Sequence, residues 1–398
     1  SQKKLTEEEM IAFKNRFNIP LSDEDAGAAK YYRPADDSPE TQYMLERRKA
    51  LGGALPVRKS TAAPLEVPPL EIFQAILDGS ADRDMSTTMA FVRLLTMITR
   101  DKKMGKYVVP IVPDEARTFG MEGMFRQLGI FSSVGQLYEP QDKEQVMFYK
   151  EDKTGQILEE GITEAGAFSS WIAAATAYST HSVNMVPFYI YYSMFGFQRI
   201  GDLAWAAGDC RSRGFLIGAT AGRTTLAGEG LQHQDGHGMI QAGLIPNCIS
   251  YDPTFAYEMA VIIHDGMKRM YNAQEDIYYY ITAMNESYQQ PALPKGSEKG
   301  IVKGMYLYKS GGKKKNKVQL MGSGTILREV ISAAELLMQD WSVDADIWSC
   351  TSFNELTREA QEIERWNRLH PLEDAKIPYI TKLLTGHRGP AIAATDYI

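Results

Sequence analysis

Between residues 187 and 195 the chain reads Pro187-Phe188-Tyr189-Ile190-Tyr191-Tyr192-Ser193-Met194-Phe195, an aromatic and apolar run that predicts a buried strand. The small residues at 167–178 before it predict a helix, and Glu164 stands where the chain enters that helix. A glutamate is ordinary at this place because the helix dipole favours it by about 0.3–1 kcal/mol. The aromatic strand that follows is less ordinary, and it directs attention to this carboxylate.

The same alternation of strand and helix continues on both sides of this unit. Helices are predicted from Ser86 and over 254–269, and further strands over 107–112, 213–218, 245–250 and 276–284. This order predicts an α/β fold with a doubly wound, mainly parallel sheet covered on both faces. Ligands bind such sheets at the carboxyl ends of the strands, so we expect a site there.

A second unit of the same kind is predicted near the C-terminus. Its signals are strands over 318–324, 346–350 and 391–394 and a helix over 326–339, so a partial second α/β domain is expected. The last strand is followed by only four residues, from which we expect a domain cut short. The predicted organisation is a connecting arm at 1–62, a first domain at 63–293, a polar linker at 294–316 and the partial domain at 317–398.

Composition excludes several classes of function. The net charge of −7 disfavours nucleic acid as a partner, because phosphate binding needs a basic face. Three widely spaced cysteines predict free thiols in a reducing compartment. No run of 18 apolar residues and no signal-peptide core occurs, so we expect a cytoplasmic protein without a membrane partner.

Several long and unusual strings carry a family resemblance. They are 114–123 (DEARTFGMEG), 189–199 (YIYYSMFGFQR), 228–233 (GEGLQH) and 250–253 (SYDP). Through these sequence motifs the chain resembles the homodimeric bacterial pyruvate dehydrogenases, which depend on thiamine diphosphate and belong to the transketolase-like superfamily. The resemblance covers essentially all of the 398 residues. It implies that the first domain is the pyrimidine-binding domain of such an enzyme.

The resemblance makes Glu164, His233 and Tyr192 catalytic residues and Phe195 a cofactor-binding residue. Glu164 would hydrogen-bond a ring nitrogen of the cofactor's aminopyrimidine and share its proton with it. Phe195 would stack on that ring, and Tyr192 would lie close to the reacting centre. From the residues alone, Glu164 is equally a helix-capping carboxylate, and the two aromatic rings are equally core packing. For Tyr189 and Tyr191 we predict core packing only.

Other site residues follow from the same resemblance, each with an ordinary alternative. Arg199 would organise the active-site channel, or pair with an acid such as Asp202. His233 would donate a proton or a hydrogen bond to the substrate. The remaining residues that would contact the cofactor are Ile162, Asp114 and Glu229, although Asp114 is equally a helix cap paired with Arg117.

A metal site in the loop that carries His233 is a weaker alternative. His233, Asp235 and His237 alternate there, but the flanking glycines give no rigid scaffold and no fourth ligand is evident. We therefore predict no metal ligand in this chain. The Mg²⁺ and diphosphate motif of thiamine enzymes, Gly-Asp-Gly followed by paired asparagines, does not occur in this sequence. The resemblance places those ligands in a diphosphate-binding domain outside it.

The function implied by the resemblance is oxidative decarboxylation of pyruvate with thiamine diphosphate and Mg²⁺, followed by reductive acetylation of a lipoyl group. The implied partners are a second copy of the chain and the dihydrolipoyl acetyltransferase with its lipoyl domain. The chain by itself is expected to be inactive. Two alternatives stay open, a transketolase-like transferase and a non-catalytic dimerisation or assembly domain.

Overall fold

The computed structural model describes residues 4–54, 62–113, 116–139, 149–226 and 230–398. Two compact units are present, Ser1–Lys59 and Ser60–Ile398. Three helices form the described part of the first unit: α1 (Glu7–Arg16), α2 (Asp23–Gly27) and α3 (Pro39–Ala50).

The first unit is more helical than the sequence analysis predicts. Only the first helix is expected there, and its capping box between Thr6 and Glu9 is present. The other two helices begin at Ser22 and Ser38, whose side chains accept hydrogen bonds from backbone N–H groups three residues later. Neither α1 nor α3 contains a buried residue.

The main sheet of the second unit has the order β5-β2-β6-β7-β9-β8, and every pairing among its described strands is parallel. This confirms the predicted α/β fold. The aromatic strand ends at Tyr191, four residues earlier than predicted, because the chain then tightens into a 3₁₀ turn, η3 (Ser193–Phe195). The strands are β2 (Val108–Val112), β5 (Leu158–Glu159), β6 (Val186–Tyr191), β7 (Phe215–Ala219), β8 (Cys248–Tyr251) and β9 (Tyr278–Ala283).

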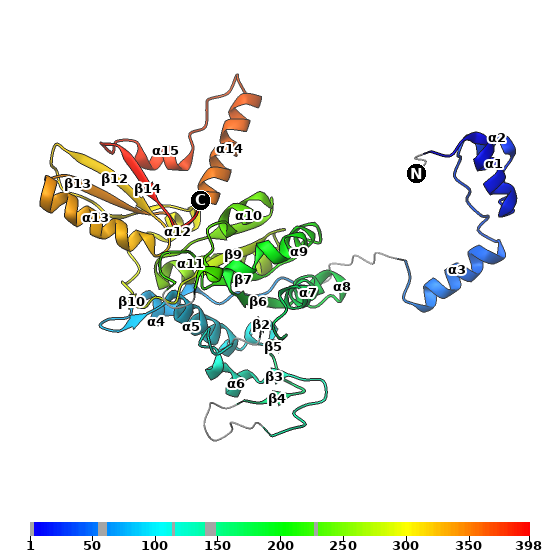
Figure 1. Ribbon diagram of the computed structural model, residues 1–398, viewed down its shortest axis with the longest axis horizontal. Helices are drawn as coiled ribbons and strands as arrows, with labels where there is room; N and C mark the ends of the chain where they lie inside the picture. The colour runs from blue at the N-terminus through cyan, green and yellow to red at the C-terminus, as the bar shows by residue number, and fades with distance from the viewer. Residues whose placement is uncertain (1–3, 55–61, 114–115, 140–148, 227–229) are drawn as a thin grey trace. The chain divides into compact units, whose positions relative to one another are not determined.

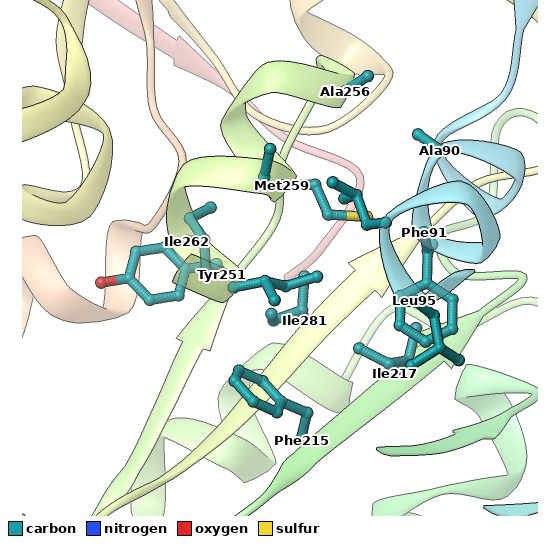
Figure 2. Packing of buried hydrophobic residues seen from close by; sticks show 14 of the residues in the cluster. Ala90, Phe91, Leu95, Phe215, Ile217, Tyr251, Ala256, Met259, Ile262 and Ile281 are labelled. Atoms are coloured by element: carbon teal, nitrogen blue, oxygen red, sulfur yellow. The ribbon is translucent and has the colours of Figure 1, made fainter. Parts of the chain in front are cut away.

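Helices cover both faces of this sheet. On one face, α5 (Thr87–Arg100) and α11 (Ala256–Met267) pack against strand side chains such as Phe215 and Ile217, as Figure 2 shows. On the other face lie α7 (Glu164–Ala175), α9 (Phe197–Asp209) and α10 (Gly238–Leu244), which pack against Tyr189, Leu216 and Tyr280. Successive residues of β7 therefore enter opposite cores, which is the pattern of a strand buried on both faces.

The second sheet has the order β11-β13-β12-β14 (Figure 1). The strands β12 (Lys317–Gly322), β13 (Asp344–Ser349) and β14 (Ala391–Ala394) are parallel. In contrast, β11 (Tyr306–Lys309) pairs antiparallel with β13. Residues 294–316 thus differ from a polar linker, because they contain this strand and α12 (Glu298–Lys303). The helices of this sheet are α13 (Ile326–Trp341), α14 (Phe353–Leu369) and α15 (Tyr379–Leu384).

Shorter elements complete the second unit. Strands β1 and β10 pair antiparallel, and β3 and β4 pair parallel. The elements are η1 (Leu70–Phe73), α4 (Gln74–Leu77), β1 (Asp84–Met85), η2 (Gly105–Tyr107), α6 (Glu122–Leu128), β3 (Ile130–Phe131), β4 (Glu151–Asp152), α8 (Ala177–Thr180), η4 (Leu231–His233), η5 (Lys268–Asn272) and β10 (Tyr288–Gln289).

A buried carboxylate joins the two sheets. Glu258, in the first turn of α11, accepts hydrogen bonds from the Tyr306 hydroxyl at 2.7 Å and the Ser349 hydroxyl at 2.6 Å, both from the second sheet. The backbone N–H groups of Thr254 and Phe255 also donate to it, at 2.6 Å and 3.0 Å. Burial raises the pKa of Glu258, and these four donors offset part of that cost.

Candidate active site

The predicted site residues follow four neighbouring strands of the main sheet. Glu164 comes after β5, Asp114 after β2, the segment from Tyr192 to Arg199 after β6, and the loop with Glu229 and His233 after β7. The order β5-β2-β6-β7 places the carboxyl ends of these four strands next to one another. Asp114 and Glu229 lie outside the described residues.

Glu164 is the first residue of α7, in the segment that follows β5. Thr163 caps this helix by accepting a hydrogen bond from the N–H of Gly166 at 3.2 Å. The Glu164 side chain is 16% exposed, and its Oε1 accepts a hydrogen bond from Arg199 Nη1 at 2.7 Å. The carboxylate is thus withdrawn from bulk water without being buried.

Arg199 joins this carboxylate to the aromatic turn. Its guanidinium carbon lies 4.1 Å from the centre of the Phe195 ring, a cation–π contact. Of the two roles considered for Arg199, the ion pair with an acid is present, although the acid is Glu164 and not Asp202. Because Arg199 is 51% exposed, the pair contributes only about 0–1 kcal/mol to stability.

Three rings form a cluster beside this ion pair. The His233 ring lies 4.8 Å from the Tyr192 ring and 5.3 Å from the Phe195 ring, measured between centroids. The Tyr192 and Phe195 rings are 6.0 Å apart and nearly perpendicular. Residues that are far apart in the sequence, such as Tyr192 and His233, are therefore in contact. Hereafter, Glu164, Arg199, Phe195, Tyr192 and His233 are called the crevice cluster.

The other predicted residues are placed as follows. Ile162 lies in the loop before α7 with 74% of its surface exposed. Tyr189 and Tyr191 are buried in the core beneath the cluster, as predicted. Burial, with a smaller contribution from the Glu164 carboxylate, raises the pKa of the Tyr189 hydroxyl.

Three residues near the cluster are not assigned to it by the sequence analysis. Asp235 accepts a hydrogen bond from Ser193 Oγ, and Ser193 Oγ lies 3.1 Å from the hydroxyl of Tyr280. The sequence analysis considers Asp235 only as a weak metal-ligand candidate. Among the described residues, no group of three or more His, Cys, Asp or Glu side chains could hold a metal ion. The position of Asp235 just before a helix is the signal that could have identified it as an acceptor of backbone N–H groups.

Comparisons with known proteins agree with this architecture. The pattern of the family described as "Pyruvate dehydrogenase E1 component middle domain" matches residues 65–291, and that of "Transketolase-like TK C-terminal domain" matches residues 304–398. Among solved structures, the transketolase from Leishmania mexicana superposes with a TM-score of 0.62 at 14% identity, covering 98% of this chain and 51% of that one. The transketolase from Campylobacter jejuni gives 0.58 at 16% identity, with the same coverage. At these identities the likeness shows the fold alone.

Sequence relatives are much closer. The chain is 62% identical over 397 residues to the "Pyruvate dehydrogenase E1 component" of Pseudomonas aeruginosa and 55% identical over 398 residues to that of Escherichia coli K12. It spans 45% and 44% of the lengths of these relatives. No described helix combines the length and apolar character needed to cross a membrane. Because the family pattern matches residues 65–291, more than half of the chain, the chain belongs to the pyruvate dehydrogenase E1 component family, and these residues are the middle domain of that family.

Proposed function

We propose that this chain supplies the pyrimidine-binding side of a thiamine-diphosphate site in a pyruvate dehydrogenase. The observation that carries the proposal is the crevice cluster. A partly withdrawn carboxylate, Glu164, and an aromatic ring, Phe195, lie on either side of Arg199, which contacts both. The names of the close relatives support the reaction class.

The residues present fit the aminopyrimidine part of this cofactor. A heteroaromatic ring with a nitrogen acceptor needs a protonated acid to donate to it and a flat apolar surface on which to stack. Glu164 can provide the first and Phe195 the second, and the exposed Ile162 adds an apolar side chain before the helix. When bound, the cofactor supplies stabilisation of the negative charge that pyruvate leaves behind when CO₂ departs.

The roles of the side chains follow from this arrangement. Glu164 would hydrogen-bond the ring nitrogen and share a proton with it once the bond from Arg199 to Oε1 opens or moves to the other oxygen. His233 lies against Tyr192 and Phe195, where its imidazole can donate a hydrogen bond or a proton to the substrate oxygen.

A Mg²⁺ site does not fit the described residues. No suitable group of ligands occurs among them, so no step is derived through the metal. We propose that its ligands, together with the diphosphate contacts, come from a diphosphate-binding domain outside residues 1–398.

The proposed assembly has a homodimer at its centre. We further propose that pyruvate is the substrate and that the lipoyl domain of a dihydrolipoyl acetyltransferase accepts the acetyl group. The family name of the relatives, as one component of pyruvate dehydrogenase, supports such a partner. The three cysteines are free thiols, which supports a cytoplasmic location.

The test replaces Glu164 with Gln after the chain is combined with the diphosphate-binding domain of the Pseudomonas aeruginosa relative. Pyruvate-dependent reduction of ferricyanide is expected to fall about 10²- to 10⁴-fold, the range for loss of a positioned acid or base. The matched control is Glu160→Gln, the same change four residues earlier, which should leave the rate unchanged. An unaltered rate in Glu164→Gln would favour a non-catalytic assembly domain. Activity with a ketose phosphate in place of pyruvate would favour a transketolase-like enzyme.

A further inference from the structure

Asp235 is a buried carboxylate that connects three segments around the crevice cluster. It lies between η4, which carries His233, and α10, and it is 1% exposed. One oxygen accepts hydrogen bonds from the backbone N–H groups of His237 at 3.0 Å and Gly238 at 2.8 Å. The other oxygen accepts the short hydrogen bond from Ser193 Oγ. Three donors satisfy this buried group, as a carboxylate withdrawn from water requires.

Ser193 is the second anchor of this connection. It is buried and belongs to η3, the turn that carries Tyr192 on one side and Phe195 on the other. Its hydroxyl also lies 3.1 Å from that of Tyr280, a fully buried residue of β9. The aromatic turn is thus fixed to the sheet through Tyr280 and to the His233 loop through Asp235.

The backbone around this contact leaves no spare room. A Cβ atom at Gly238 would lie 2.5 Å from a carboxylate oxygen of Asp235 and 3.0 Å from the Tyr280 hydroxyl. A Cβ atom at Gly218 would lie 2.6 Å from the same hydroxyl. The absence of side chains at these two positions is therefore what allows the three polar groups to meet.

We propose that Asp235 is a positioning residue that sets the place of His233 against the Tyr192 and Phe195 rings. Asp235 follows His233 by two residues, so the bond to Ser193 fixes the loop at the turn whose rings His233 contacts. The catalytic consequence rests on the proposed function, whereas the placement of His233 does not.

The first experiment compares two matched serine variants of this chain. Ser193→Ala removes the hydroxyl that donates to Asp235, and Ser349→Ala removes an equally buried hydroxyl that donates to Glu258. Both urea midpoints should decrease, since each variant loses a hydrogen bond to a buried carboxylate, and Ser193→Ala should decrease at least as much because it also loses the contact with the Tyr280 hydroxyl. The ring resonances of His233 should shift only in Ser193→Ala, because the ring currents of Tyr192 and Phe195 act on them. The chain has six histidines, and His233→Gln assigns the resonance.

A second pair of variants tests the carboxylate itself. Asp235→Asn keeps an acceptor for the two backbone N–H groups and can donate to Ser193, so it should keep the His233 resonance close to that of the wild type. Asp235→Ala should shift the His233 ring resonances as Ser193→Ala does. If Asp235→Ala does not fold, Ser193→Ala still decides the test. A folded Ser193→Ala with an unchanged His233 resonance would overturn the proposal.

Activity separates this inference from the proposed function. In the combined enzyme, Ser193→Ala should lower kcat with pyruvate by at least about tenfold, because a displaced catalytic group loses its alignment. Ser349→Ala should keep the wild-type kcat. A shifted His233 resonance in a protein with no pyruvate activity would leave the positioning role intact and contradict only the proposed function.

Discussion

Replacing Asp252 with Asn should stabilise this protein at neutral pH. Asp252 follows β8 at the contact between the two sheets and is 4% exposed. Its carboxyl group accepts hydrogen bonds from Thr282 Oγ1 at 2.6 Å and Ser323 Oγ at 2.8 Å. Burial is the largest cause that raises its pKa to about 6, and the nearby carboxylates of Asp396 and Glu258 raise it further.

The magnitude follows from the difference between this pKa and the ordinary value of 3.8. One pKa unit corresponds to about 1.4 kcal/mol, so ionising Asp252 costs the folded state about 3 kcal/mol. Between pH 4 and pH 6 the native state binds more protons than the unfolded chain. The free energy of unfolding therefore decreases as the pH rises through this window and stays lower above it.

An asparagine removes the ionisation and keeps the hydrogen bonds. Its oxygen can accept from Thr282, and its amide can donate to Ser323, whose hydroxyl can then donate to Thr395 Oγ1 at 2.9 Å. The variant should be more stable than the wild type at pH 8. At pH 5 the variant should already show about half of its full stability gain over the wild type. The difference in free energy of unfolding should then grow by about 1.4 kcal/mol from pH 5 to pH 8.

The assay is urea unfolding of both proteins at several pH values, followed by tryptophan fluorescence. The control is Asp396→Ala, because Asp396 accepts hydrogen bonds from the backbone N–H groups of Arg223 and Thr224. Leaving these groups unpaired should destabilise the protein by about 1–3 kcal/mol. An advantage of Asp252→Asn that does not change with pH, or a less stable variant at pH 8, would refute the reasoning.

Two further substitutions test the packing and the second sheet. Gly238→Ala should destabilise by about 1–3 kcal/mol in urea unfolding, because its Cβ would press on Asp235, whereas Gly201→Ala, which has open space around it, should be neutral or stabilising. Asp346 accepts bonds from Lys317 Nζ at 2.8 Å and His387 Nδ1 at 2.9 Å, which lower its pKa although burial opposes this. The stabilisation from the ionised Asp346 should be present above about pH 4 and lost as the pH falls. Asp346→Asn should therefore be about 3 kcal/mol less stable than the wild type at pH 7, measured by thermal unfolding. Equal stability of variant and wild type at pH 7 would contradict this.

The fold was predictable where burial leaves a continuous trace in the sequence. Strand β7 shows this, because Phe215 and Leu216 enter opposite cores and both must be apolar. The elements that the prediction missed have weaker local signals. Helix α2 has only five residues, and β11 lies in a polar stretch and exists because it pairs with β13, about forty residues later. Such a pairing depends on tertiary contacts that no local pattern records.

The clustering of the candidate residues was predictable in part, although the family resemblance, and not a burial pattern, singled these residues out. Glu164, Tyr192, Phe195, Arg199 and His233 follow strand ends, and the parallel sheet brings strand ends together. The hydrogen bonds that hold the segments of these residues in place could not be predicted in this way. The partners of Ser193 lie 42 and 87 residues away in the sequence, so their meeting depends on the order of the strands, which the sequence analysis did not predict.

The ion pair between Glu164 and Arg199 is compatible with a ligand entering the crevice. With Arg199 half exposed, the pair is worth about 0–1 kcal/mol, whereas a ligand with a micromolar Kd gains about 8 kcal/mol. Opening the pair therefore consumes only a small part of the binding free energy. The pair still limits where the carboxylate can point, because Arg199 is itself held over the Phe195 ring. The pair thus restrains the Glu164 side chain before a ligand arrives, and its small free energy does not prevent a ligand from binding.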